Sequence, residues 1–241
     1  PLPDVWIIQD GDVMRILDLW CGSKSATQAF ADAGHEVISV DIDPQWNPTI
    51  CKDILDVTLQ ELEAFGRFDF IWASPDCSVF TIAAAGQGHF LLPDVEPRTR
   101  KAKDMVLRIM HTRFLCENLW PRIGFMIENP RGLLRKLPIL RGLGRRTVTY
   151  CSYGDGRMKP TDLWGVLPGW ASHPPCYNEN PNCHHERSPR GSDSGTQGLE
   201  WSDRIRIPIE LSREIFEACE FYKKIEDWGT LDKWGIYDER A

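Results

Sequence analysis

Residues 13–23 read Val13-Met14-Arg15-Ile16-Leu17-Asp18-Leu19-Trp20-Cys21-Gly22-Ser23, an apolar run followed by a turn. The apolar residues over 13–19 predict a strand, and the glycine after them predicts a tight turn. A helix is expected over 26–34, and a second strand over 36–41 that ends in an acid. This order of elements is typical of the start of a βαβ unit.

The alternation of strands and helices continues along the chain. Further strands are expected over 68–73, 124–128 and 147–151, and helices over 55–65 and 99–119. Strands separated by helices of this length form a mostly parallel sheet with right-handed crossovers, and the helices cover both of its faces. The fold class is therefore predicted to be α/β.

Four charged or reactive residues come at or just beyond the expected strand ends, namely Asp18, Asp41, Cys77 and Glu128. In sheets of this class, ligands bind outside the carboxyl ends of the strands. The shared placement predicts one functional site at that edge of the sheet.

The first turn and the acids that follow it favour a nucleoside ligand. A small-residue turn lets a ligand approach the backbone, and Asp41, which lies 19 residues beyond Gly22, can accept hydrogen bonds from both ribose hydroxyls. A third acid, Asp53, follows a position where another strand fits. Because the G-x-G-x-x-G pattern of dinucleotide binders is absent, the expected ligand lacks a pyrophosphate. The alternative is an ordinary turn with surface acids.

Two further residues have the surroundings that catalysis needs. Cys77 follows an apolar strand in the polar segment 74–78, where a nucleophile would be rigidly held yet reachable. Glu128 ends another apolar strand, so desolvation should raise its pKa and let its carboxyl group donate a proton. The alternatives are a small buried thiol and a solvated acid.

The composition is that of a globular protein of 241 residues. Its net charge of −7 argues against a protein that coats nucleic acid nonspecifically, although basic runs over 98–103 and 131–146 could bind phosphates. No apolar run reaches the roughly 18 residues that a membrane span needs, and no leader peptide is visible. The eight cysteines are expected to be reduced.

Taken in order, these pieces resemble the C5-cytosine DNA methyltransferase family, and most closely its short bacteriophage members. Residues 18–22 (Asp-Leu-Trp-Cys-Gly) are similar to the S-adenosylmethionine turn of the family, and 75–77 (Pro-Asp-Cys) to its Pro-Cys loop. Residues 128–130 (Glu-Asn-Pro) resemble its Glu-Asn-Val strand end, and 207–211 (Ile-Pro-Ile-Glu-Leu) its last motif. Asp41 matches the ribose acid.

The resemblance implies a Rossmann-like methyltransferase sheet and transfer of a methyl group from S-adenosylmethionine to C5 of cytosine in DNA. Cys77 would attack C6 of a base flipped out of the stack, and Glu128 would hold N3 and the exocyclic amine. Arg157 and Lys159 stand where the family has its Gln-x-Arg-x-Arg motif, so the resemblance implies that both are catalytic and leaves open which one reaches the cytosine O2. The expected cofactor-binding residues are Asp18, Leu19, Trp20, Cys21, Gly22, Ser23, Asp41, Ile42, Asp53, Ile54, Ser74, Pro75, Arg204 and Arg206.

The chain departs from the family pattern at two places. Asp76 stands where the family has proline, and a carboxylate there should raise the pKa of the Cys77 thiol unless it points away. Arg204 and Arg206 stand near the Gly-Asn-Ser of the last motif. They would either pair with phosphate or Asp203, or favour a donor that carries an extra carboxylate.

The expected catalytic domain comprises residues 1–166 and 204–241, and a small irregular target-recognition insertion comprises 167–203. The insertion is rich in proline and short for the family, so a metal ion could staple it. Its predicted zinc ligands are His173, Cys176, Cys183 and His184. The alternative is unlinked thiols and solvent-facing histidines.

Three other functions stay open on the sequence alone. They are carboxymethyl transfer from a carboxylated donor, methylation of cytosine in RNA, and base flipping without turnover. The expected partner is DNA and not a membrane. The expected state is a monomer in the cytoplasm of a bacterium or a phage-infected cell, with restriction-modification as one setting.

Overall fold

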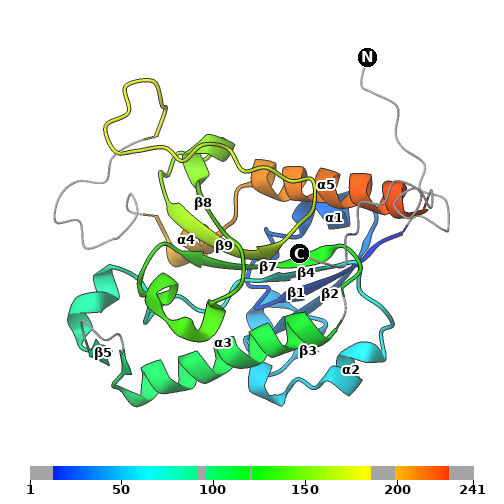
Figure 1. Ribbon diagram of the computed structural model, residues 1–241, viewed down its shortest axis with the longest axis horizontal. Coiled ribbons are helices and arrows are strands. Elements are labelled where there is room, and N and C mark those ends of the chain that lie inside the picture. The colour runs from blue at the N-terminus through cyan, green and yellow to red at the C-terminus, as the bar shows by residue number, and fades with distance from the viewer. Residues whose placement is uncertain (1–12, 92–95, 120, 186–198, 228–241) are drawn as a thin grey trace.

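The computed structural model describes residues 13–91, 96–119, 121–185 and 199–227. Its centre is a seven-stranded sheet of order β3-β2-β1-β4-β7-β9-β8 (Figure 1). The first five strands in this order run parallel: β3 (Ile50–Cys51), β2 (Glu36–Asp41), β1 (Arg15–Leu19), β4 (Phe70–Ala73) and β7 (Gly124–Pro130). β9 (Pro160–Val166) runs antiparallel to both of its neighbours, β7 and β8 (Arg145–Thr149).

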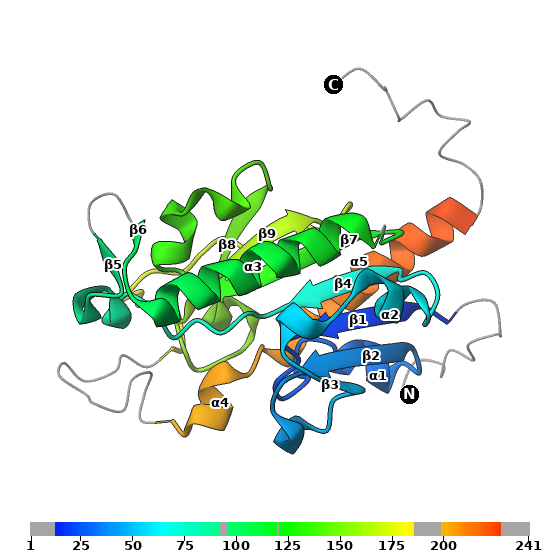
Figure 2. The same ribbon diagram turned by 90° about the horizontal axis from the view of Figure 1, so that it is seen from below.

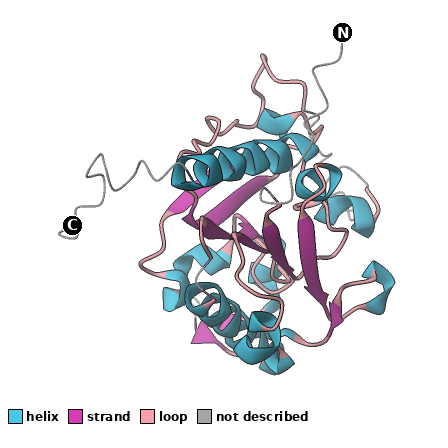
Figure 3. Cartoon of the chain, turned by 90° about the vertical axis from the view of Figure 1, so that its right-hand side faces the viewer, coloured by secondary structure: helices cyan, strands magenta, loops and turns pink. Residues whose placement is uncertain are grey.

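Helices cover both faces of this sheet, as Figures 2 and 3 show. The long helix α3 (Arg100–Asn118) lies on one face, and α1 (Gln28–Asp32) packs with α5 (Ile209–Asp227) on the other. The shorter elements are α2 (Leu59–Glu63), α4 (Trp201–Ile205) and the hairpin of β5 (Phe90–Leu91) and β6 (Glu96–Pro97). Single 3-10 turns occur at Pro44–Trp46, Ile54–Asp56, Ala83–Gln87, Leu133–Lys136, Pro138–Leu140 and Tyr150–Tyr153.

The strands are buried on both faces because their side chains alternate between two apolar clusters. On β1, Ile16 belongs to the cluster under α5, and Leu17 belongs to the cluster under α3. On β4, Phe70 and Ile71 divide in the same way. The predicted α/β fold class, with helices on both faces, is confirmed.

Two expected elements differ in the structure. The helix expected over 55–65 is broken, because Asp53 caps a 3-10 turn and Thr58 caps α2 separately through its own side chain. The strand expected over 147–151 ends at Thr149, and the chain then turns.

Strand β9 is absent from the sequence-based expectation. Its sequence begins with a proline, ends near a glycine and holds Asp162, three signals that normally argue against a strand interior. Asp162 is fully buried, but Arg135 binds it at 2.5 Å and Thr147 donates to it at 2.7 Å. Gly165 is required, because a Cβ there would lie 2.1 Å from the carbonyl oxygen of Phe125. Tertiary partners therefore stabilise a strand that local propensity disfavours.

β9 ends at Val166, where the recognition insertion is expected to begin. Residues 171–185 contain turns and irregular backbone, with neither helix nor strand, and residues 186–198 lie outside the described residues. The division into domain and insertion remains a prediction. Within the described ranges, every helix is too short or too polar to span a bilayer.

Candidate active site

A cavity of about 430 Å³ opens at the carboxyl ends of β1, β2, β4 and β7. Its size is typical of small-molecule sites, which measure about 300–1,000 Å³. The structure brings most of the predicted site residues to its wall: Trp20, Cys21, Gly22, Ser23, Asp41, Ile42, Asp53, Ile54, Ser74, Pro75, Cys77, Glu128 and Lys159. The remaining predicted residues do not line it: Asp18, Leu19, Arg157, Arg204 and Arg206.

The turn after β1 is held in one shape by Asp41. The Asp41 carboxylate accepts hydrogen bonds from the backbone N–H of Gly22 (2.9 Å) and of Asp43 (2.9 Å). Gly22 has a φ of 45° and Trp20 one of 61°, so the turn uses left-handed backbone twice. The Trp20 indole donates a hydrogen bond to Thr112 on α3 (3.0 Å), and this bond offsets part of the strain. The turn is thus a rigid part of the cavity wall.

Asp18 lies behind this turn and not in the cavity. It is almost fully buried and accepts a hydrogen bond from the Thr27 hydroxyl (2.6 Å). Burial raises its pKa to about 7. We therefore assign Asp18 to the support of the turn instead of direct ligand contact.

Asp53 lines the cavity but already has a partner, which sequence reasoning missed. Arg108 on α3 binds its carboxylate with two nitrogens, at 2.5 and 3.1 Å. This guanidinium lowers the pKa of Asp53. No local pattern in the sequence links the two residues, which lie 55 positions apart.

Cys77 lies on the loop after β4, and a buried side chain fixes that loop. The Asn129 amide, next to Glu128, donates to the carbonyl oxygen of Pro75 (2.8 Å). Asp76 is exposed, and its two carboxylate oxygens accept from the backbone and hydroxyl of Ser78 (2.8 Å each). Asp76 therefore shapes the loop as a turn-forming side chain.

The thiol of Cys77 is protonated at neutral pH. Burial raises its pKa to about 11, and Glu128 and Asp76 add to the rise. Lys159 acts in the opposite direction and lowers the pKa. The ammonium group of Lys159 is therefore the neighbouring charge that favours a thiolate.

Glu128 is buried at the end of β7, and burial raises its pKa as the sequence predicts. The hydroxyl of Tyr150 donates to its Oε1 atom (3.1 Å). Sequence reasoning missed Tyr150. The only local signal was its position near the end of the strand expected over 147–151.

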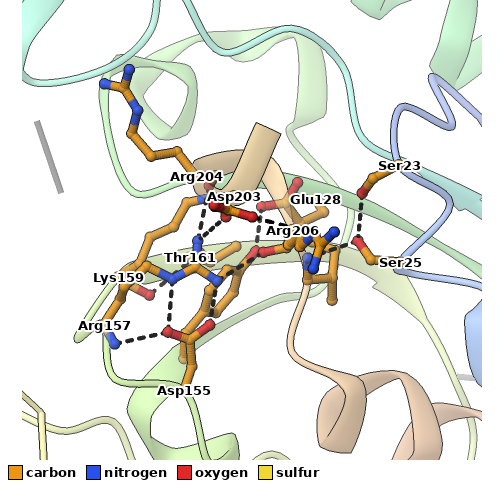
Figure 4. Close-up of polar contacts among 12 residues, drawn as sticks. Ser23, Ser25, Glu128, Asp155, Arg157, Lys159, Thr161, Asp203, Arg204 and Arg206 are labelled. Atoms are coloured by element: carbon orange, nitrogen blue, oxygen red, sulfur yellow. Dashed lines mark hydrogen bonds and ion pairs between the residues drawn. The ribbon is translucent and has the colours of Figure 1, made fainter. Parts of the chain in front are cut away.

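Arg157 and Lys159, predicted together, have different surroundings (Figure 4). Arg157 is buried and pairs with Asp155. Its guanidinium also donates to the backbone carbonyls of Asp203 (2.8 Å), Arg204 (3.1 Å) and Arg206 (3.1 Å). Arg157 does not line the cavity, and its donors hold the 203–206 segment.

Lys159 reaches the cavity. Its Nζ atom lies 4.8 Å from the centre of the Tyr150 ring and donates to the carbonyl oxygen of Arg204 (3.2 Å). An ammonium group over an aromatic face is a favourable arrangement.

Arg204 and Arg206 are not among the residues that line the cavity. Arg206 is 63 % exposed and lies 3.7 Å from the carboxylate of Asp203. In Figure 4 the Arg204 side chain extends away from Lys159 and Glu128. The pairing of Arg206 with Asp203 is one of the two outcomes that the sequence left open. Neither arginine lines the cavity, and their assignment as cofactor ligands stays a prediction.

The predicted zinc ligands separate into two groups. His173 stacks on Tyr153 at 4.6 Å and pairs with Glu214, while His184 bonds the carbonyl oxygen of Asp155 at 3.0 Å. Cys176 and Cys183 instead gather with two residues that the prediction omitted, Cys151 and His185. The predicted histidines, His173 and His184, therefore lie outside this cluster of ligating atoms.

No family model matches the chain. The chain is 28 % identical over 230 residues to a protein of Frog virus 3 (isolate Goorha) named probable DNA (cytosine-5)-methyltransferase, a match that covers 86 % of this chain and 100 % of the relative.

Two solved structures are also similar. The Dnmt2 methyltransferase of S. pombe is 17 % identical, with a TM-score of 0.42, and the match covers 66 % of this chain and 52 % of that one. A DNMT2 variant of Spodoptera frugiperda is 18 % identical, with a TM-score of 0.43, over 65 % of this chain and 50 % of that one. The chain thus spans about half of the length of these two structures. The name of the viral relative agrees with the resemblance that the ordered motifs indicated, which is a similarity to C5-cytosine methyltransferases.

Proposed function

We propose that the protein transfers a methyl group from S-adenosylmethionine to C5 of a cytosine in DNA through a covalent bond between Cys77 and C6. One observation carries the proposal: Cys77 and Glu128 line the same cavity as the turn held by Asp41. A nucleophile, an acid of raised pKa and a nucleoside-type turn are the parts that this chemistry needs.

The cofactor end of the cavity is the turn at Gly22 together with Asp41. Each Asp41 oxygen accepts one backbone hydrogen bond and keeps a further lone pair, so the carboxylate can still accept the ribose hydroxyls. Ile42 and Ile54 add apolar wall for an adenine ring. Asp53 is less available to bind the cofactor, because Arg108 already binds its carboxylate. When bound, S-adenosylmethionine supplies a methyl group on a sulfonium centre.

The base end of the cavity holds the reacting side chains. C5 of cytosine is unreactive until a nucleophile saturates the neighbouring carbon, so a Cys77 thiolate forms a bond from Sγ to C6. The Glu128 carboxyl, whose pKa burial raises, gives a proton to N3 as electron density moves into the ring. C5 then takes the methyl group and gives its proton to a solvent water. Elimination of the Cys77 sulfur as thiolate restores the ring, while N3 returns its proton to Glu128.

Two side chains prepare these steps. Lys159 favours the thiolate by its charge. Tyr150 holds Glu128 by a hydrogen bond and so fixes where its proton points. The target base must leave the helix stack to reach the cavity, at a cost of a few kcal/mol that contacts in the pocket must offset.

The donor in this proposal is S-adenosylmethionine itself. A carboxylated donor would need a cation beside its extra carboxylate. Arg204 and Arg206 do not line the cavity, Arg108 and Lys52 are paired with Asp53 and Glu61, and we assign the Lys159 ammonium group to the Cys77 thiolate. We assign the substrate as DNA and residues 167–203 as the recognition insertion, in line with the viral relative's name and the motif order.

The test is incubation with labelled S-adenosylmethionine and cytosine-containing DNA, followed by nucleoside mass spectrometry. We expect 5-methylcytosine from the wild type and from Cys51→Ser, a matched change at an exposed cysteine that does not line the cavity. We expect none from Cys77→Ala. Modification that survives Cys77→Ala would contradict the covalent mechanism.

A parallel arm separates the other substrates and donors. DNA that contains 5-fluorocytosine should trap a covalent complex that resists denaturation, whereas the matched RNA should not. A trapped RNA complex would change the substrate class. A mass increment larger than one methyl group would change the donor.

A further inference from the structure

Four side chains outside the active site gather their ligating atoms in one place. The thiols of Cys151, Cys176 and Cys183 and one ring nitrogen of His185 all lie within 4.8 Å of one another. All eight cysteines of the chain are described, and none of them forms a disulfide. We propose that these four residues form a structural zinc site that fastens residues 173–185 to the end of β8.

The separations suit a tetrahedral ion. Zinc binds thiolate at about 2.3 Å and imidazole at about 2.0–2.1 Å, which sets the sulfur-to-nitrogen separation at about 3.6 Å. The Cys176 Sγ atom lies 3.7 Å from the Nδ1 atom of His185. Three thiolates and one imidazole are a usual donor set for structural zinc, and this mixture of soft ligands disfavours magnesium and calcium.

The Cys176 thiol already accepts a hydrogen bond of the kind that surrounds metal-bound thiolates. The Asn180 amide donates to the Cys176 sulfur at 3.3 Å, and the Cys176 backbone N–H donates to the Thr149 hydroxyl at 2.8 Å. Donors around a thiolate orient it and balance its charge. The cluster is therefore more than a chance meeting of thiols.

The loop needs a fastening because it has no apolar core. From residue 171 to residue 185, no side chain is buried, and Tyr177 is 61 % exposed. A few polar contacts hold the loop, such as those of His173 with Ser152 (2.8 Å) and of His184 with Asp155 (3.0 Å). Segments that cannot bury apolar surface commonly rely on disulfides or metal ions.

Cys151 shows which parts of the fold the zinc site would connect. Cys151 is buried and follows Tyr150, the residue that donates to Glu128. In Figure 1 the loop is the yellow segment that extends beyond β8. Zinc would thus fix the position of this loop relative to the strand end behind the active site. The inference does not depend on the proposed methyl transfer.

The test measures metal directly in the untagged full-length protein. We expect about one zinc per chain by plasma mass spectrometry after gel filtration. After chelation, added cobalt should produce the visible bands of a tetrahedral thiolate site, and zinc should displace them. Cys183→Ser and His185→Ala change partly exposed loop residues and should lose this metal, because even loss of an outer-shell partner weakens metal sites about 10–100-fold.

The matched controls are His184→Ala and His173→Ala, which remove histidines of the same loop that lie outside the cluster. Both controls should retain one zinc and the cobalt bands. A wild-type protein with neither zinc nor cobalt bands would overturn the proposal. So would zinc that survives both Cys183→Ser and His185→Ala, or an intact mass that shows a disulfide among the three cysteines. Methyl transfer activity plays no part in this readout.

Discussion

Asn129 donates a hydrogen bond from its side-chain amide to the carbonyl oxygen of Pro75, 2.8 Å away. This contact joins the strand end that carries Glu128 to the loop that carries Cys77, two segments 54 positions apart in the chain. Asn129 is fully buried, so the bond is shielded from water. One side-chain amide therefore joins the two segments that carry the proposed catalytic groups.

Replacing Asn129 with Asp should uncouple the two segments, because the carboxylate cannot donate to Pro75. A buried carbonyl without its partner costs about 1–3 kcal/mol, and we expect the free energy of unfolding to fall by that amount or more. Adduct formation with 5-fluorocytosine DNA should also slow. Urea denaturation and single-turnover kinetics check both effects. Asn182→Asp, at an exposed position of the loop, is the control, and an equal effect there would contradict the assignment.

Tyr150→Phe should lower the rate of methyl transfer with little change in stability. The variant removes the donor to Glu128 but keeps the ring that Arg157 and Lys159 face. A hydrogen bond to an uncharged acid contributes about 0.5–1.5 kcal/mol, so the rate should fall about 2- to 10-fold.

The same variant should shift the pH profile. The Tyr150 hydrogen bond lowers the pKa of Glu128 against the larger effect of burial, so its loss should move the pKa of Glu128 further upward. In a plot of the rate constant against pH, the limb that reports Glu128 should move to higher pH. Tyr177→Phe, which changes an exposed hydroxyl, should leave the profile in place.

Arg157 and Lys159 should give opposite outcomes when each is changed to Met. Arg157 is a buried partner of Asp155, and breaking a buried pair commonly costs about 3–5 kcal/mol of stability. Lys159→Met should instead reduce the rate of Cys77 attack, because the charge that favours the thiolate is lost. Thermal unfolding and the rate of covalent trapping separate the two. Arg206→Met is the control for a general loss of positive charge. An Arg157→Met variant that is stable but inactive would instead support a direct catalytic role for Arg157.

Asp18 should make the stability of the protein depend on pH. Burial raises its pKa from the ordinary value of 3.8 to about 7. Because the folded pKa lies above the unfolded one, the contribution of Asp18 is fully present below about pH 4 and is lost as the pH rises through about 7. Asp18→Asn keeps an acceptor for Thr27 but does not titrate. Between pH 5 and pH 8, the free energy of unfolding of the wild type should fall by about 2–3 kcal/mol more than that of the variant.

Chemical denaturation at the two pH values measures this difference. Asp32→Asn, a change at an exposed acid, should leave the slope of the wild type unaltered. Parallel profiles for the wild type and Asp18→Asn would show that Asp18 does not titrate in this range.

The candidate active site could be predicted from the sequence in outline because its parts are local patterns. The apolar run before Gly22, the acid at the end of β2 and the strand ends at Cys77 and Glu128 each depend on neighbours within a few residues. Parallel strands then bring their carboxyl ends to one edge whatever the remaining contacts are. The positions of these residues around one cavity follow from that rule.

The partners of the same residues could not be predicted, because they come from distant segments. Arg108 binds Asp53 across 55 positions, and Tyr150 reaches Glu128 across 22. Strand β9 contradicts its own propensity and forms because Arg135 and Thr147 satisfy its buried Asp162. Arg157, which the motif order placed near the substrate, turns its donors to the backbone of 203–206.

The cysteine cluster shows the same division. By itself, the sequence determined that the insertion has few apolar residues and carries the donors that zinc prefers. Only the tertiary structure decided which donors meet, since Cys151 joins from the end of β8 and His185 takes the place expected for His184. Periodicity and turn chemistry act over a few residues along the chain, whereas a ligand set depends on distances in space that the packing of the sheet and its loops creates.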